Sequence, residues 1–500
     1  MLKRASGVLI NVSSLPSEYG IGGFGKEIES LCKFLKSGGF SYWQVLPLTT
    51  IGLGNSPYSG NSAFAINYLY VDPDSLYEAG FVDKEDVNNA KSKASPYLVN
   101  YDEVYAKKSA LLHKAFNNKK DLLANELNNF YINNPWVKSY AMYMTLKEKF
   151  NNVSWINWPN KYKYIENIDE EKMIKENQLT FDYYVFEQYV LDFQWKNIKE
   201  KCNNLGIKII GDMPMYVSLD SVDVWANRLD FQLYKNGQPK KVAGVPPDYF
   251  SEDGQLWGNP LYDYKQMQKD NYSWWIKRID QAMHLYDICR IDHFRAFSEY
   301  WAIPADSTTA KNGKWVKGVG MDLFNEIFKK YDKDKFIAED LGIIDNKVRN
   351  LIKKTKLPGM RVMQFAFGEE NSIHLPCNYP KNVIGYTATH DNNTTLGWLY
   401  ELDEATRDKV LKYINCDKSV WGRGAYDNVS IKLMIKKLME SECMLAIVPV
   451  QDLYGFGADC RMNTPGVAEG NWRYRTIQEQ LDNCRINYFY ELNKATGRIW

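Results

Sequence analysis

The sequence predicts an α/β protein folded as a (β/α)8 TIM barrel, with helical and loop insertions at the C-terminal face of the barrel. Two observations predict this fold class. Eight short runs are rich in β-branched and aromatic residues and end in turn-forming or polar residues, and helical patterns lie between several of them. Such runs are typical of buried parallel strands, and their alternation with helices is typical of a barrel. The strands are expected, in chain order, at residues 7–12, 42–48, 208–214, 288–294, 335–341, 360–367, 382–391 and 444–452.

Two helices ahead of strands show a clear apolar face, which is expected to pack on the barrel. The residues on these faces are Ile28, Leu31, Cys32 and Leu35 before the second strand, and Phe186, Tyr189, Val190 and Phe193 before the third. A glycine pair at 38–39 is expected to end the first helix. A doubly wound open sheet is the alternative fold. It is disfavoured because the sequence contains no glycine-rich phosphate loop after a strand and no acidic partner about 20 residues further on.

The chain is expected to form a single catalytic barrel domain over residues 1–500, interrupted by two long insertions. Residues 49–206, between the second and third strands, far exceed an ordinary connection and carry helical patterns, so a mainly helical insertion is expected there. Residues 215–286, between the third and fourth strands, are expected to form a second insertion. Both leave from the C-terminal ends of strands, which is the catalytic face of such barrels.

Composition excludes several classes of partner. The chain of 500 residues has 62 Lys plus Arg against 61 Asp plus Glu, a formal charge of +1, so we expect neither nucleic acid nor a membrane as partner. Fifteen Trp and 35 Tyr suggest a ligand that packs on flat rings. The eight scattered cysteines form no C-x-x-C pair, and no uninterrupted apolar stretch suggests a signal peptide or membrane span. A cytoplasmic location with reduced thiols is expected.

Three of the expected strands end in carboxylates. Asp292 ends the fourth strand, Glu339 the fifth and Asp391 the seventh, so all three should point into one mouth of the barrel. Cleaving a glycosidic bond with retention needs one carboxylate that attacks the anomeric carbon and one carboxylic acid that protonates the leaving oxygen. Arg290 shares a strand face with Asp292 and is expected to lower its pKa, which suits a nucleophile. The apolar residues before Glu339, with the charge of Asp292, should keep Glu339 protonated.

Seven longer motifs resemble the 4-α-glucanotransferases, also called amylomaltases or disproportionating enzymes, of glycoside hydrolase family 77 in the α-amylase superfamily. The likeness runs essentially from end to end, and matches of this length in this order are highly specific. The motifs are SPYSGNSAFAINYLYVD (56–72), GDMPMYVSLDSVDVWA (211–226), VAGVPPDYFSEDGQLWGNPLY (242–262), RIDHFRAFSEYW (290–301), IAEDLG (337–342), TATHDNNTTLGW (387–398) and VPVQDLYGFGADCRMNTPGVAEGNWRYR (448–475).

The resemblance implies a role for each matching residue: Asp292 as nucleophile, Glu339 as acid/base and Asp391 as stabiliser of the transition state. The other residues that match substrate contacts are Arg290, His293, His390, Asp212, Gln255 and Trp257, then Tyr58 and Ser56 on the acceptor side and Asn463 near the donor chain. Tyr249 and Phe250, with Trp257, lie in a loop that the likeness places over the cleavage point. The implied substrates are α-1,4-glucans such as maltodextrins and amylose, with glucose as acceptor.

Other readings of these residues remain open at this stage. An α-amylase-type hydrolase shares the three carboxylates, and a barrel that only binds glucan could keep the shape without the chemistry. His293 and His390, each beside a carboxylate, could instead be ligands of a metal-dependent barrel hydrolase, although the first strand lacks an H-x-H. We expect no organic cofactor and no catalytic metal. Asp340 should face away from Glu339 on the strand and act as a structural partner.

Overall fold

The computed structural model describes residues 3–247 and 251–499 and places eight parallel strands in one sheet. All eight strands predicted from the sequence are present, each shorter than its apolar run. Their order in the sheet is β10-β11-β12-β1-β2-β3-β6-β9. The strands are β1 (Ala5–Leu9), β2 (Tyr42–Gln44), β3 (Lys208–Met213), β6 (Ile288–Ile291), β9 (Phe336–Ala338), β10 (Gly359–Val362), β11 (Val383–Tyr386) and β12 (Leu445–Pro449). The predicted (β/α)8 barrel is therefore confirmed.

The barrel closes at a seam between β9 and β10. The Ala338 N–H donates to the Pro358 carbonyl at 2.9 Å, and the Met360 N–H donates to Oδ1 of Asp340 at 2.6 Å. Asp340 is buried and also pairs with Arg361, whose Nη1 lies 3.2 Å from Oδ2. The Asp340 carboxylate thus replaces one of the backbone hydrogen bonds that would join the two strands. The expected structural role of Asp340 is confirmed.

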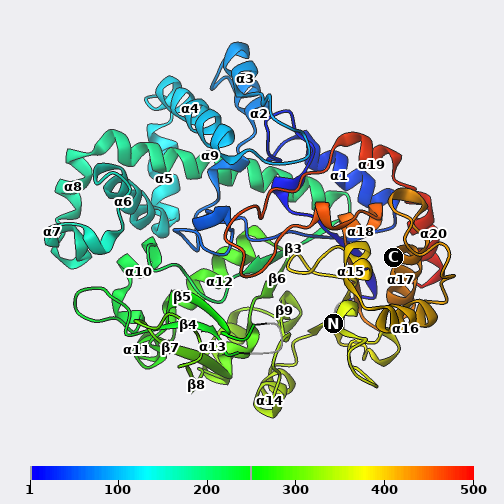
Figure 1. Cartoon of the computed structure of the whole chain (residues 1–500). Helices are drawn as coiled ribbons and strands as arrows, with labels where there is room; N and C mark the ends of the chain where they lie inside the picture. Colours follow the sequence, from blue (N-terminus) through cyan, green and yellow to red (C-terminus); the bar gives the residue numbers. More distant parts are fainter. Residues whose placement is uncertain (1–2, 248–250, 500) are drawn as a thin grey trace.

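Helices cover the outside of the barrel (Figure 1). They are α1 (Lys26–Ser37), α9 (Gln178–Asn204), α12 (Ser273–Leu285), α13 (Met321–Lys330), α14 (Asn346–Thr355), α15 (Thr395–Glu401), α16 (Glu404–Ile414), α17 (Val429–Glu440), α18 (Val450–Tyr454), α19 (Gln478–Asn483) and α20 (Ile486–Ala495). The four residues expected on the buried face of α1 are all buried. On α9, Phe186 and Val190 are buried as expected, whereas Phe193 was wrongly placed: it is 58% exposed, because it lies toward the solvent side of this long helix.

Between β2 and β3 the chain forms a group of helices on one side of the barrel (Figure 1). They are α2 (Pro73–Glu78), α3 (Lys84–Ala90), α4 (Tyr101–Lys119), α5 (Ala124–Asn133), α6 (Pro135–Lys149), α7 (Asn160–Lys163) and α8 (Glu170–Glu176). The following helix, α9, contacts both this group and the barrel. Its Phe186 ring packs on Phe81 and Phe116, and its Trp195 ring lies 4.9 Å from that of Phe24.

The connections after β3 and after β6 jointly build a second sheet, which the sequence analysis did not predict. Its order is β5-β4-β7-β8, all antiparallel. Its strands are β4 (Lys241–Val245), β5 (Gln255–Pro260), β7 (Glu299–Pro304) and β8 (Lys314–Lys317); the short helices α10 (Val222–Ala226) and α11 (Tyr264–Met267) precede and follow the first two. In Figure 1 the sheet lies beside α11 and α13. Two separate connections therefore form one wall beside the barrel mouth.

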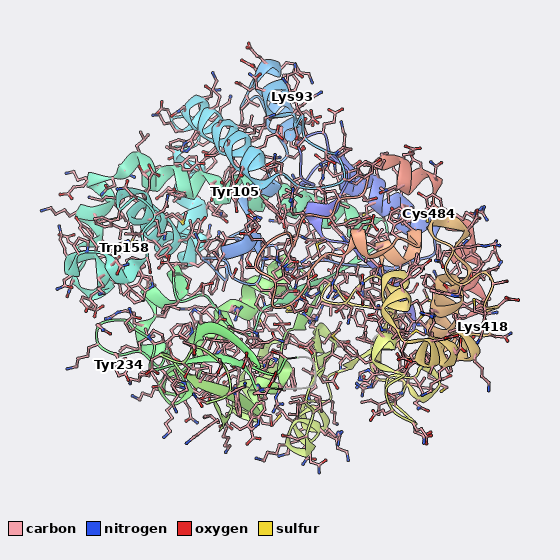
Figure 2. The ribbon with its side chains drawn as sticks, in the orientation of Figure 1. Lys93, Tyr105, Trp158, Tyr234, Lys418 and Cys484 are labelled. Carbon is pink, nitrogen blue, oxygen red and sulfur yellow. The ribbon has the colours of Figure 1, made fainter. Side chains whose placement is uncertain are left out.

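Aromatic side chains join the helical group to the connection after β3. Trp158, labelled in Figure 2, is 3% exposed, and its ring lies 5.5 Å from that of Tyr143 on α6 and 5.9 Å from that of Trp225 on α10. Much of the aromatic content that suggested ligand contacts is therefore structural packing.

Candidate active site

The carboxylates singled out in the sequence lie at one end of the barrel. Asp292 directly follows β6 and Glu339 directly follows β9, so both leave the carboxyl ends of parallel strands. Asp391 differs from the prediction. Strand β11 ends at Tyr386, because the chain turns away into a loop, and Asp391 lies five residues further on with a side chain that is 47% exposed.

Arg290 of β6 binds two carboxylates from neighbouring strands. Its register partner on β3 is Asp212, and Nη1 lies 2.7 and 2.6 Å from the two Asp212 oxygens and 3.1 Å from Oδ1 of Asp292. The Tyr58 hydroxyl donates to Oδ2 of Asp212 at 2.6 Å. Four residues singled out in the sequence are therefore in one hydrogen-bonded network, with the side chain of Asp212 fully buried.

The charge state of Asp292 differs from the expectation. Its pKa is raised to about 8: burial is the largest cause, Arg290 lowers it, and the negative charges of Asp212, Glu339 and Asp391 also raise it. The expected lowering by Arg290 is present, but the expected net result, an ionised Asp292, is not. Loss of solvent and the nearby carboxylates outweigh the guanidinium. A pocket with so much negative charge around one arginine holds at least one proton near neutral pH.

Glu339 is fixed by two backbone amides. The His293 N–H donates to Oε2 at 2.8 Å and the Leu341 N–H donates to Oε1 at 2.7 Å. Burial raises the pKa of Glu339, as expected, while Arg290 and both amides lower it. The first amide points at Glu339 because His293 has a left-handed backbone with φ of 44°, which is rare for a residue other than glycine. Strain of this kind is found at functional sites.

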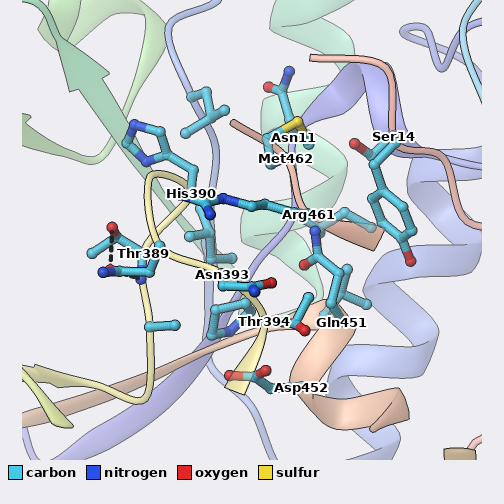
Figure 3. A pocket seen from close by; sticks show the side chains of 18 residues that line it. Asn11, Ser14, Thr389, His390, Asn393, Thr394, Gln451, Asp452, Arg461 and Met462 are labelled. Carbon is cyan, nitrogen blue, oxygen red and sulfur yellow. Dashed lines mark hydrogen bonds between the residues drawn. The ribbon is translucent and has the colours of Figure 1, made fainter. Parts of the chain in front are cut away.

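Asp391 is held by the segment that follows β12. Asn463 Nδ2 donates to Oδ1 of Asp391 at 2.7 Å, and Arg461 Nη2 donates to its backbone carbonyl at 2.8 Å. Nε2 of His390 lies 3.4 Å from Oδ2. Residues 388–390 and 392–394, on either side of Asp391, line a small pocket together with Asn11, Gln451 and Arg461 (Figure 3). Asn463, which the sequence placed near the donor chain, is thus next to the third carboxylate.

The two histidines are packed against aromatic rings. The ring of His390 stacks on that of Tyr58 at 5.3 Å and 11°, and that of His293 meets the Trp257 ring edge to face at 4.9 Å. Burial lowers the pKa of His390, and it lowers that of His293 to about 3, so both are neutral at physiological pH. A neutral imidazole can both donate and accept a hydrogen bond, which suits contact with hydroxyl groups.

The remaining expected contacts are placed as follows. Trp257 lies on β5, is 38% exposed, and its Nε1 donates to Oε1 of Gln255 at 3.0 Å. The Oγ of Ser56 accepts from the Tyr58 N–H at 3.2 Å and so holds the turn that carries Tyr58. Tyr249 and Phe250 lie outside the described residues.

Sequence reasoning missed Trp472. Its ring lies 5.7 Å from that of Tyr58 and 6.0 Å from that of His390, and it has a left-handed backbone with φ of 64°. The aromatic motif that contains it was noted, but nothing in a single sequence indicates which ring of such a motif backs a binding residue.

Among residues 3–247 and 251–499, no group of three His, Cys, Asp or Glu side chains is arranged to hold a metal ion. Every helix in the described part of the chain is too short or too polar to cross a bilayer. All eight cysteines are described and carry free thiols.

A parallel eight-stranded barrel with carboxylates and an arginine at its carboxyl mouth defines an enzyme of the carbohydrate-active barrel class. Comparison with known proteins narrows this class. The family described as 4-alpha-glucanotransferase, glycoside hydrolase family 77, matches residues 10–479. The chain belongs to this family of glycosyl-transferring enzymes.

Individual relatives agree over nearly the whole length. The chain is 41% identical to the 4-alpha-glucanotransferase of Aquifex aeolicus over 480 residues, covering 95% of this chain and 96% of that protein. It is 39% identical to that of Clostridium butyricum, covering 98% and 100%. The solved amylomaltase from Streptococcus agalactiae in complex with acarbose superposes with a TM-score of 0.94 at 37% identity, covering 100% of each chain.

Proposed function

We propose that the chain moves α-1,4-glucan segments from a donor maltodextrin to an acceptor glucan or to glucose by a retaining double displacement. In the first step a carboxylate oxygen of Asp292 bonds to the anomeric carbon while Glu339 gives its proton to the leaving glycosidic oxygen. In the second step Glu339 takes the proton of an acceptor 4-hydroxyl, whose oxygen displaces Asp292. Two inversions give net retention.

The observation that carries this proposal is the different surroundings of the two carboxylates. Asp292 has the Arg290 guanidinium 3.1 Å away, whereas Glu339 accepts hydrogen bonds from two neutral amides. The guanidinium stabilises the ionised form in which Asp292 must attack. We therefore assign Asp292 as the nucleophile and give the proton that the first step needs to Glu339. Asp391 then supplies the negative charge that an oxocarbenium-like transition state favours.

The other residues are assigned to the sugar at the cleavage point, to the acceptor side or to the donor chain. Arg290, His293 and His390 contact the sugar at the cleavage point, with Tyr58 on the acceptor side. Ser56 is assigned to the acceptor side and Asn463 to the vicinity of the donor chain. Asp212, Gln255 and Trp257 are assigned as further substrate contacts, and Tyr249 and Phe250 are assigned to substrate binding from the family likeness alone.

Transfer, rather than hydrolysis, requires that water be kept from the covalent intermediate. The exposed Trp257 ring beside His293 offers an aromatic face to sugar C–H groups, and a bound acceptor there excludes water. In this proposal residues 1–500 form one barrel domain with insertions at 49–206 and 215–286, and the protein acts in the cytoplasm without nucleic acid or cofactor.

Incubation with maltotriose tests the reaction. Transfer yields glucose and a ladder of longer dextrins while the number of reducing ends stays nearly constant. A steady rise in reducing ends would identify a hydrolase, and absence of any product would identify a glucan-binding protein; either result overturns the proposal. Glu339→Gln protein purified in the same way controls for contaminating glucosidases.

A further inference from the structure

The loop that follows Glu339 is held by a buried arginine, Arg295, that the proposed reaction does not use. Arg295 lies in the 3₁₀ turn Phe294–Phe297, three residues after Asp292, and is 3% exposed. Its Nη1 donates to the carbonyl of Ile343, and its Nη2 lies 4.0 Å from Oδ2 of Asp345, the residue that caps α14. The arginine thus connects the segment after β6 to the segment after β9.

The Arg295 guanidinium also stacks on an aromatic ring of the second sheet. Its central carbon lies 3.7 Å from the centre of the Trp315 ring on β8, and Trp315 is in turn T-shaped against Trp301 on β7. A guanidinium between an aromatic face and a carbonyl has little freedom to rotate. The second sheet therefore fixes Arg295, and Arg295 fixes Ile343.

The anchored segment itself has few other supports. Gly342 has φ of 80° and no atom within 4 Å of where a Cβ would stand, and Ile343 is 49% exposed. Yet Leu341, next in the chain to Gly342, supplies one of the two amides that hold Glu339. His293, two residues before Arg295, supplies the other.

We propose that Arg295 is a positioning residue for the transfer reaction: it ties together the two segments that each give Glu339 one backbone N–H. The proposal rests on the proposed function, in which Glu339 is the acid. Arg295 does not touch substrate in this role. It acts by keeping both amides on the carboxyl group, so that the proton of Glu339 points at the glycosidic oxygen.

The rates with two glycosyl donors distinguish this positioning role from a general effect of Arg295 on folding. Maltotriose needs a proton on its leaving oxygen, whereas α-maltosyl fluoride has a leaving group that departs without protonation. Misplacing a reacting group by about 1 Å can cost about a hundredfold in rate. Arg295→Met is expected to lower kcat/KM for maltotriose about tenfold or more, through kcat rather than KM, and that for the fluoride by less than about threefold.

Three further variants sharpen the test. Trp315→Ala should shift the ratio of the two kcat/KM values in the same direction, whereas Trp315→Phe, which keeps an aromatic face, should restore it. Arg407→Met is the matched control, because Arg407 also stacks on a tryptophan, 4.8 Å from the Trp421 ring, and donates to the Leu402 carbonyl at 3.0 Å. Arg407 lies on α16, outside the site, so Arg407→Met should react with maltotriose and with α-maltosyl fluoride as the parent protein does. If Arg295→Met does not fold, Arg295→Lys and the Trp315 variants decide.

Glu339→Gln distinguishes a failure of the acid assignment of Glu339 from a failure of the positioning role of Arg295. It should abolish most activity on maltotriose and spare kcat/KM for the fluoride, which reports only the first step and not the second step that uses Glu339 as base. If it does so while the Arg295 and Trp315 variants lose both activities equally, the positioning role is refuted and the acid assignment stands. If Glu339→Gln also loses both activities equally, the acid assignment falls, and the role of Arg295 falls with it.

Discussion

Replacing Asp212 by Asn tests whether the carboxylate network sets the charge state of Asp292. Asp212 raises the pKa of Asp292 by repulsion. Both side chains lie against the same Nη1 of Arg290, Asp212 at 2.6 Å and Asp292 at 3.1 Å, so their nearest oxygens are at most about 6 Å apart. At an effective dielectric constant of about 20, two charges at that separation repel by about 3 kcal/mol, or about two pKa units.

The expected result is a shift in the acid limb of the pH profile. A nucleophilic Asp292 must be ionised, so kcat/KM for maltotriose falls as pH drops through its pKa. Removing the charge of Asp212 lowers that pKa. The acid limb should therefore move to lower pH, by about one to two units once its coupling to Glu339 is allowed for. The assay is glucose release from maltotriose at low substrate concentration, measured across the acid and neutral range.

Asp223→Asn serves as the control, because Asp223 is also a buried carboxylate but belongs to another network, in which it accepts from the Ala63 N–H at 2.8 Å. Its substitution should leave the acid limb in place. An acid limb that stays put in Asp212→Asn, or moves to higher pH, would show that Asp292 does not feel the charge of Asp212 and would refute this account of the network.

Three other outcomes are expected. Asp292→Asn, Glu339→Gln and Asp391→Asn should each lower turnover by about 10²–10⁴ or more with the fold intact by circular dichroism, and the losses should not multiply in the triple variant; near-normal turnover of Glu339→Gln on maltodextrin would overturn its role. Trp257→Ala should slow transfer and raise the ratio of reducing ends formed to glucose released from maltotriose; a slower variant with an unchanged ratio would limit Trp257 to binding the donor. Dialysis against EDTA should leave transfer unchanged, and activity that is lost and then restored by one divalent ion would reopen the metallohydrolase reading.

The barrel strands were predictable because parallel strands buried on both faces leave continuous apolar runs in the sequence. The second sheet left no such trace. Strand β5 contains glycine and proline and is largely exposed, and β8 is short and exposed, so neither has the local pattern of a strand. Each pairs with the strand before it in its own connection, β5 with β4 and β8 with β7, and the pairing of β4 with β7 joins the two connections.

The candidate site divides in the same way. The three candidate carboxylates could be found because each follows an apolar run, and their partners because they share strand faces or family motifs. Residues that act through contacts distant in sequence could not. Trp472 meets Tyr58 from the far end of the chain, and Arg295 meets Ile343 and Trp315 only in the folded protein. The left-handed backbone of His293 is likewise a product of the fold.

The seam of the barrel has a consequence for how the protein loses activity. Strand β9, which Glu339 directly follows, pairs along its length with β6 but meets β10 through the Ala338 amide and the side chain of Asp340. Cooperative units of a protein open locally at different free energies, and weakly paired edges open first. Hydrogen exchange should therefore be faster for the Ala338 and Met360 amides than for those of β1 and β12. On gradual warming, enzymatic activity should disappear before the helical signal does.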